Sequence, residues 1–211
     1  MTRRLVALSL LGLVAACTDP FVPRRTPTYG FADPFGDVFH WLPDRLPVRY
    51  YADSRGNMAA LVTDGVRSWE RQFLYSEYRG VLVGDSTAAD VIVVWADSVP
   101  PTADPDPGPP VVSCGGVTQG ILDSTGQAFA EPFRIEISIL TGTSFSAAQV
   151  QACVSRVVIH ELGHSLGVLQ EAPDTLAIMY ATPRVRQPAA IDRRTVQVLY
   201  HTEATLAPAP P

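Results

Sequence analysis

The sequence predicts an α+β domain in which a β-sheet packs against three helices. Short apolar runs rich in Val and Ile alternate along the chain with segments whose apolar residues recur every three or four positions. An apolar content of 46% over 211 residues is enough for one hydrophobic core. With 18% charged residues, the composition is that of neither a disordered protein nor a coiled coil.

The first residues have the pattern of a signal peptide. Arg3 and Arg4 precede an apolar stretch that ends at Cys17 and is shorter than the roughly 20 residues needed to cross a bilayer. Residues 14–17, VAAC, resemble the lipobox of bacterial lipoproteins. This resemblance implies that residues 1–16 are removed and that Cys17 carries lipid, which anchors the exported protein in the bacterial cell envelope, at the periplasmic face or the cell surface. The alternative is an ordinary secretory signal with an incidental cysteine.

Three further segments follow. Residues 17–45 are rich in proline and predict an extended tether that can lie against the domain. Residues 46–203 carry the periodic patterns of the folded domain, and residues 204–211 predict a disordered Pro/Ala tail.

Within the domain, alternating or continuous β-branched runs predict strands, and three- and four-residue apolar spacing predicts helices. The expected strands cover residues 46–53, 89–97, 116–122 and 133–140. The expected helices cover residues 57–75, 146–166 and 191–201, and a proline-rich surface loop covers residues 100–110. The second helix has the clearest ends, because Ser146 and Gln149 can form a capping box and Gly167 can end it in a left-handed conformation.

The second helix also contains the motif HELGH. His160 and His164 lie one turn apart on one face, so both imidazoles can bind one metal ion. Glu161 is adjacent, where its carboxylate can act on a water without binding the metal. A single zinc ion would polarise a carbonyl and activate that water, with Glu161 as general base, which is the chemistry of peptide-bond hydrolysis.

The stretch HELGHSLGVLQ, residues 160–170, followed by Met179 in AIMYA, resembles the metzincin metallopeptidases. The preceding segments GVRSWERQF and ADVIVVW are most similar to the matrixin branch. The resemblance implies a twisted mixed β-sheet with a backing helix, an active-site helix and a C-terminal helix. It also implies that Gly167 turns the chain toward a third ligand, that Met179 forms a Met-turn beneath the metal, and that residues 180–183 wall a substrate pocket.

The third metal ligand departs from the family pattern, because Gln170 stands where the family has histidine or aspartate. Three interpretations are open. Gln170 binds through its amide oxygen, Glu171 or Asp174 replaces it as an anionic ligand, or the site is a two-histidine remnant. The remaining histidines, His40 and His201, lie in segments that the family does not bring to the metal.

The two remaining cysteines, Cys114 and Cys153, predict a disulfide, because paired cysteines in an exported protein are more often bonded than free. Cys153 lies about 10 Å along the helix from His160 and therefore cannot bind the same metal ion.

These patterns favour a monomeric zinc endopeptidase that cleaves extracytoplasmic proteins or peptides and is attached to a membrane through Cys17. A catalytically weakened metzincin-fold binding lipoprotein is the alternative, because of Gln170. Nucleic acid is not an expected partner, since the formal net charge is -5 and no basic cluster occurs.

Overall fold

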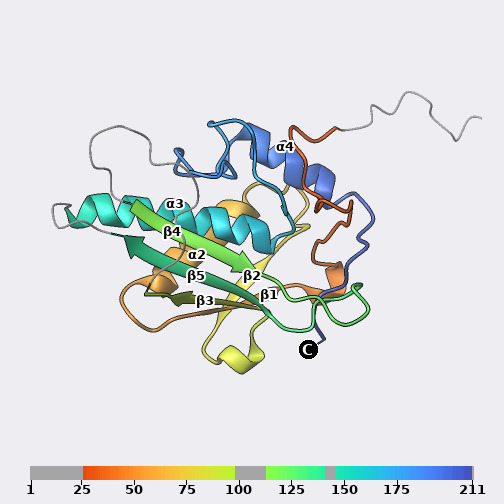
Figure 1. Ribbon diagram of the computed structural model, residues 1–211, viewed down its shortest axis with the longest axis horizontal. Helices are drawn as coiled ribbons and strands as arrows, with labels where there is room; N and C mark the ends of the chain where they lie inside the picture. Colours follow the sequence, from red (N-terminus) through yellow and green to blue (C-terminus); the bar gives the residue numbers. More distant parts are fainter. Residues whose placement is uncertain (1–25, 98–112, 141–145, 211) are drawn as a thin grey trace, which may run out of the picture.

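The computed structural model describes residues 26–97, 113–140 and 146–210 (Figure 1). The expected signal peptide, Cys17 and the expected loop at 100–110 lie outside these ranges. Within the described part of the chain, no helix is both long and apolar enough to cross a membrane.

The chain forms a mixed α/β domain around one five-stranded sheet in the order β2-β1-β3-β5-β4. The strands are β1 (Val48–Ala52), β2 (Gly80–Val83), β3 (Val91–Trp95), β4 (Ser113–Gln119) and β5 (Phe133–Leu140). Strands β1, β2, β3 and β5 pair in parallel, whereas β4 runs antiparallel to β5 and forms an edge of the sheet. The sheet is therefore mixed, as expected for an α+β domain.

Three α-helices accompany the sheet: α2 (Met58–Glu70), α3 (Ala147–Ser165) and α4 (Ala190–Leu199). Helices α2 and α3 pack against each other, α2 against β1 to β3 and α3 against β4 and β5. Figure 1 shows α3 between the sheet and α4. Because β4 and β5 pack against one part of it and α2 against another, α3 is buried without a break over residues 157–163. Short 3-10 turns η2 (Pro43–Arg45) and η3 (Ser86–Ala88) complete the described elements.

Both predicted ends of α3 are confirmed. The Ser146 side chain accepts a hydrogen bond from the Gln149 backbone, and the Gln149 side chain accepts one from the Ser146 backbone. At the other end, Gly167 has a φ of 107°. A side chain at this position would also overlap the carbonyl oxygen of Phe39. The turn after α3 therefore needs glycine for two reasons.

Other boundaries differ from the expectation. The helix expected to reach residue 75 ends at Glu70, and Leu74 and Tyr75 are exposed rather than packed. Strand β2 was not among the expected strands, and β4 begins at Ser113 rather than at residue 116.

The folded domain begins before Leu46. Tyr29, Phe39 and Trp41 belong to the buried core, although they lie in the expected tether. The indole of Trp41 donates to the carbonyl of Ser165 at the end of α3. Aromatic side chains between the prolines thus anchor residues 26–45 to the domain, which the proline content alone did not indicate.

The folded domain also continues past residue 203. Leu206 is buried, and its amide donates to the carbonyl of Val38. Ala207 forms a parallel β-bridge with Ala128. Backbone pairing and one apolar anchor hold most of the expected tail in place, so the prediction of disorder is wrong for these residues.

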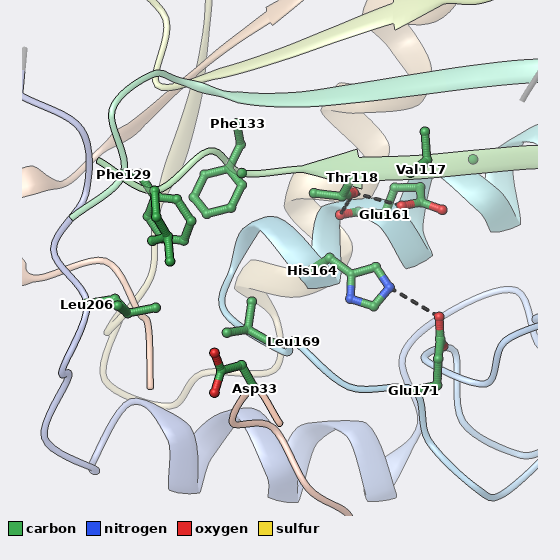
Figure 2. Close-up of a pocket in the computed structure, with 13 residues that line it drawn as sticks. Asp33, Val117, Thr118, Phe129, Phe133, Glu161, His164, Leu169, Glu171 and Leu206 are labelled. Atoms are coloured by element: carbon green, nitrogen blue, oxygen red, sulfur yellow. Dashed lines mark hydrogen bonds and ion pairs between the residues drawn. The ribbon is translucent and has the colours of Figure 1, made fainter. Parts of the chain in front are cut away.

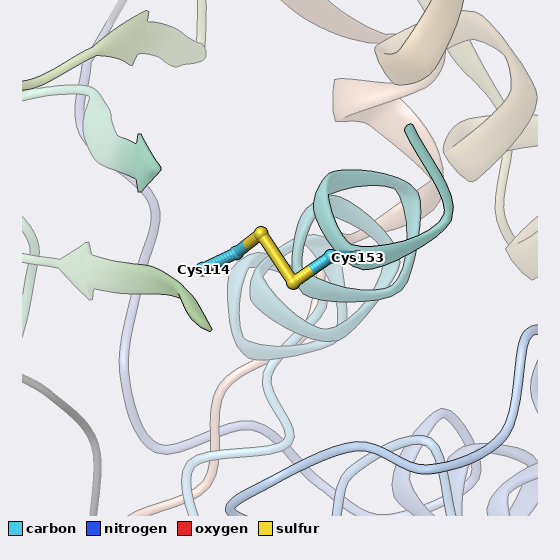
Figure 3. Close-up of a disulfide and its surroundings, with 2 residues drawn as sticks. All are labelled: Cys114 and Cys153. Carbon is cyan, nitrogen blue, oxygen red and sulfur yellow. A yellow bond between two sulfur atoms is a disulfide. The ribbon is translucent and has the colours of Figure 1, made fainter. Parts of the chain in front are cut away.

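A disulfide joins Cys114 on β4 to Cys153 on α3, with 6.0 Å between their Cα atoms (Figure 3). The predicted pairing is confirmed. The bond links the edge strand to the helix that carries the HELGH motif.

Candidate metal centre

Two histidines of α3 and one glutamate of the following loop bring three ligand atoms together. The Nε2 atoms of His160 and His164 lie 3.2 Å apart, and each lies 3.4 Å from Oε1 of Glu171. Figure 2 shows His164 and Glu171 facing each other at the pocket. Within the described ranges, these three residues form a group whose donor atoms lie close enough together to hold one metal ion.

The triangle of donor atoms has the size of a metal site. In a tetrahedral zinc site with ligand bonds of about 2.0 to 2.1 Å, neighbouring ligand atoms lie about 3.3 Å apart. The three separations of 3.2, 3.4 and 3.4 Å agree with that value. Among the described residues the group supplies three donor atoms, one fewer than a tetrahedral ion takes.

Backbone carbonyls fix the protonation of both imidazoles. Nδ1 of His160 lies 2.9 Å from the carbonyl oxygen of Ile178, and Nδ1 of His164 lies 2.6 Å from that of Val168. A carbonyl oxygen only accepts, so each Nδ1 must carry the proton and donate. In neutral imidazoles, the Nε2 lone pairs then point toward each other and toward the carboxylate. Such convergence needs a shared positive charge, either a proton on one ring or a metal ion.

The electrostatics of the group favour a cation. Burial raises the pKa of Glu171, but hydrogen bonds and positive charge from His160 and His164 outweigh it and lower that pKa to about 2. Burial lowers the pKa of His160, yet the carboxylates of Glu171 and Glu161 more than offset it, so the pKa lies above its ordinary value. The carboxylate is therefore ionised across the physiological range and stabilises positive charge among the three side chains.

The loop after α3 decides which side chain reaches the histidines. The turn at Gly167 is followed by a hydrogen bond from the Leu169 amide to the carbonyl of Phe31 and by a parallel bridge between Ala172 and Tyr180. With both ends held, the loop directs Glu171 to the histidine pair.

The other two proposed third ligands point elsewhere. The Gln170 amide nitrogen donates to the carbonyl of Ala32, and its amide oxygen packs against Gly30. Asp174 accepts a hydrogen bond from the Leu176 amide in its own turn. Of the alternatives considered from the sequence, Glu171 is the one that the structure brings to the two histidines.

Glu161 lies in the same pocket as His164 and Glu171. Its Oε2 lies 2.7 Å from the hydroxyl of Thr118 on β4. Gly116, two residues earlier on β4, leaves the space that the Glu161 side chain fills, because a Cβ there would come within 2.5 Å of its Oε1 and 2.6 Å of its Cγ. The edge strand thus positions the candidate general base.

Met179 is fully buried and packs against Gly163 of α3, where a Cβ would overlap its Sδ. The preceding residue, Ile178, supplies the carbonyl that orients His160. Asp192 of α4 holds this turn by accepting from the amides of Ile178 at 3.0 Å and Met179 at 3.4 Å.

The N-terminal segment reaches the same turn. The hydroxyl of Tyr29 donates to Oδ1 of Asp192 at 2.8 Å. A chain of contacts therefore runs from Tyr29 through Asp192 and Ile178 to the His160 ring. Sequence reasoning missed Tyr29, Asp192 and Thr118. The one local signal was the placement of an acid in the first turn of the last helix, which also fits a simple helix-end charge effect.

The other histidines are not near this group. Nε2 of His40 lies 2.8 Å from the carbonyl oxygen of Thr202, and Nδ1 of His201 contacts the carbonyl of Gln197 on its own helix. Both are structural or surface residues, as expected.

The fold and the site define a mixed α/β protein with a candidate two-histidine, one-glutamate metal centre. No protein-family model matches the chain, and no curated protein matches its sequence.

Proposed function

We propose that this chain is a zinc-dependent endopeptidase of the metzincin type. The observation that carries the proposal is the triangle of His160, His164 and Glu171 donor atoms, with Glu161 in the same pocket. Two imidazoles and one carboxylate around an open position form a ligand set typical of catalytic zinc. A zinc ion held there would supply Lewis acidity that polarises the scissile carbonyl and acidifies the attacking water.

The chain's own residues would move the proton. The Glu161 carboxylate accepts the proton of the attacking water and delivers it to the amine that leaves when the C–N bond breaks. Thr118 orients that carboxylate through its hydroxyl. The carbonyls of Ile178 and Val168 keep Nδ1 of each histidine protonated, which leaves both Nε2 atoms free to bind metal.

The edge position of β4 supports an extended peptide as the substrate. Strand β4 pairs with β5 on one side, and its residues 116–118 line the pocket. An extended chain can add to such an edge through main-chain hydrogen bonds, which would place a peptide carbonyl near the metal group.

Glu171 also bears on the alternative of a weakened binding protein. That alternative was motivated by Gln170, whose neutral amide is a weak ligand. An anionic oxygen from Glu171 at the histidine pair removes this motive and favours the enzyme.

We further propose that the protein is exported and anchored through Cys17. The disulfide between Cys114 and Cys153 supports an oxidising compartment, where such bonds persist.

The test combines metal analysis with proteolysis. Purified protein should bind one zinc ion and cleave casein or a fluorogenic peptide library, and chelation should abolish the activity reversibly. Glu161→Gln should retain zinc and lose about 10³-fold in kcat. His201→Ala is the matched control, because His201 lies outside the pocket, and it should behave as the wild type. Folded protein that takes up no zinc, or zinc-loaded protein that cleaves nothing, would contradict the proposal.

A further inference from the structure

A cavity of about 370 Å³ extends from the metal group past the end of β4. Glu161, His164 and Glu171 line one part of it (Figure 2). The rest is walled by apolar side chains from four separate segments: Leu122, Phe129, Phe133, Leu169 and Leu206. This cavity is not the pocket that the family resemblance places at residues 180–183, since none of those residues lines it.

The aromatic wall is preformed. The rings of Phe129 and Phe133 lie 4.5 Å apart, and both contact Phe39 of the core, at 5.0 and 5.2 Å between ring centroids. Both phenylalanines are almost fully buried. A side chain at Gly120 would come within 2.6 and 2.8 Å of the two rings, so this glycine allows the rings to close against the strand end. The wall therefore needs no rearrangement to receive a ligand.

One carboxylate in the cavity has no part in the metal chemistry. Asp33 and Leu169 lie across the pocket from Thr118 in Figure 2. Oδ1 of Asp33 accepts from the amides of Phe35 and Asp37, both at 2.8 Å, which fixes the carboxylate on a tight turn. Its Oδ2 makes no hydrogen bond or ion pair to any other described residue. Among the described residues that line the cavity there is no arginine, so none of them forms an ion pair with Asp33 there.

Resting on the proposed function, we propose that this cavity is a substrate subsite that selects arginine, and lysine less strongly. The aliphatic stem of such a side chain would pack between the phenylalanine wall and Leu206, and its charged end would pair with Asp33. A largely apolar wall with a carboxylate fixed beside it fits this side-chain type better than a purely apolar or an acidic one.

The subsite serves residues on the N-terminal side of the cleaved bond. Gly120 and Leu122 follow the C-terminal end of β4. A peptide that pairs antiparallel with β4 runs with its N-terminal part toward that end. The arginine would therefore precede the scissile bond in the substrate.

Peptides identical except for Arg, Leu or Glu before the cleaved bond would test this. For the zinc-loaded wild type we expect kcat/KM for the Arg peptide to exceed that for the Leu peptide by about 2- to 5-fold, with the Glu peptide poorest. Asp33→Asn keeps an oxygen for the turn amides and removes the charge, so the Arg:Leu ratio should fall to about 1. Asp44→Asn removes an exposed acid outside the cavity and should preserve the ratio.

A binding measurement separates this proposal from the proteolytic one. Fluorescence anisotropy with the same peptides measures binding without turnover when Glu161→Gln is used. This variant should bind the Arg peptide more tightly than the Leu peptide, whereas the double variant with Asp33→Asn should not. Cleavage without an Arg preference would overturn the subsite and leave the peptidase standing. Selective binding of the Arg peptide without cleavage of any peptide would overturn the peptidase proposal and support the subsite. An Arg preference that persists in both assays with Asp33→Asn would also overturn the subsite.

Discussion

The hydroxyl of Thr118 on β4 lies 2.7 Å from Oε2 and 3.0 Å from the backbone oxygen of Glu161 on α3. The edge strand that would receive substrate is thereby in direct contact with the residue that would move the proton. Strand position and carboxylate orientation are coupled through one hydroxyl group.

Thr118→Val should therefore lower kcat by about 10- to 100-fold, because a hydrogen bond to a charged group contributes about 1.5 to 3 kcal/mol. Zinc content and KM should change little, since Thr118 contacts neither histidine. Thr118→Ser restores a hydroxyl and should recover most of the rate. Equal losses in the Val and Ser variants would show that the methyl group matters and that the hydroxyl does not.

Adjacent residues should differ sharply in their effect on metal binding. Glu171→Ala removes a ligand atom that lies 3.4 Å from both Nε2 atoms and should weaken zinc binding by at least about 100-fold. Gln170→Ala removes a contact to Ala32 and should change zinc affinity only a few-fold. Competitive titration with a chromogenic chelator measures both. Gln170→His gives a third comparison, and a large gain in affinity from it would contradict the assignment of Glu171.

Tyr29→Phe should destabilise the protein through the turn below the histidines. The change removes one hydrogen bond from the fully buried Asp192 carboxylate, at an expected cost of about 1 to 3 kcal/mol in the free energy of unfolding. Because Asp192 holds Ile178, zinc affinity should fall as well. Urea unfolding and zinc titration check the two effects. Tyr75→Phe, at an exposed position, is the control. Equal effects in both variants would contradict a role for the hydrogen bond from Tyr29 to Asp192.

Buried tyrosines, Tyr50 and Tyr78 among them, should make the fold sensitive to alkali. Burial raises the pKa of Tyr50 to about 12, and the pKa of Tyr78, which donates to Tyr50, is also raised. In the unfolded chain both would lose their protons near pH 10. The unfolded state therefore binds fewer protons above pH 10, and the free energy of unfolding should fall by about 1.4 kcal/mol per pH unit for each tyrosine, without a contribution below pH 10.

Urea unfolding between pH 8 and 12 measures this slope. Tyr50→Phe removes one of the buried tyrosines whose pKa is raised and should make the decline above pH 10 shallower. An unchanged slope in that variant would exclude Tyr50 as a source of the alkaline sensitivity.

The parts of the fold with strong local patterns were predictable from the sequence. Strand β5 occupies the expected residues 133–140, and α3 begins at the predicted cap because Ser146 and Gln149 satisfy each other's backbone groups. The disulfide followed from counting cysteines. By contrast, the four residues of β2, GVLV, do not alternate, and the strand forms because β1 offers a parallel partner.

The third ligand shows why the site was only partly predictable. The two adjacent side chains point apart, Gln170 toward the carbonyl of Ala32 and Glu171 toward the two histidines. The choice depends on how far the Gly167 turn rotates the chain and on where the N-terminal segment binds Leu169 and Gln170. Both are tertiary effects. The HELGH motif therefore located the metal centre, but the sequence did not decide between the adjacent residues Gln170 and Glu171 as the third ligand.

If the protein is anchored through Cys17, as proposed, the packing of residues 26–45 into the domain would limit how far the domain extends from the membrane. If Cys17 is held at a bilayer, eight residues separate it from Thr26, where the described part of the chain begins, and a stretch of that length spans at most about 30 Å. The candidate site could then reach proteins of the same membrane and the parts of soluble proteins that come close to that membrane. It could not reach proteins farther from the membrane. The distance of a protein from the membrane would then restrict which substrates are cleaved, in addition to the fit of their side chains in the pocket.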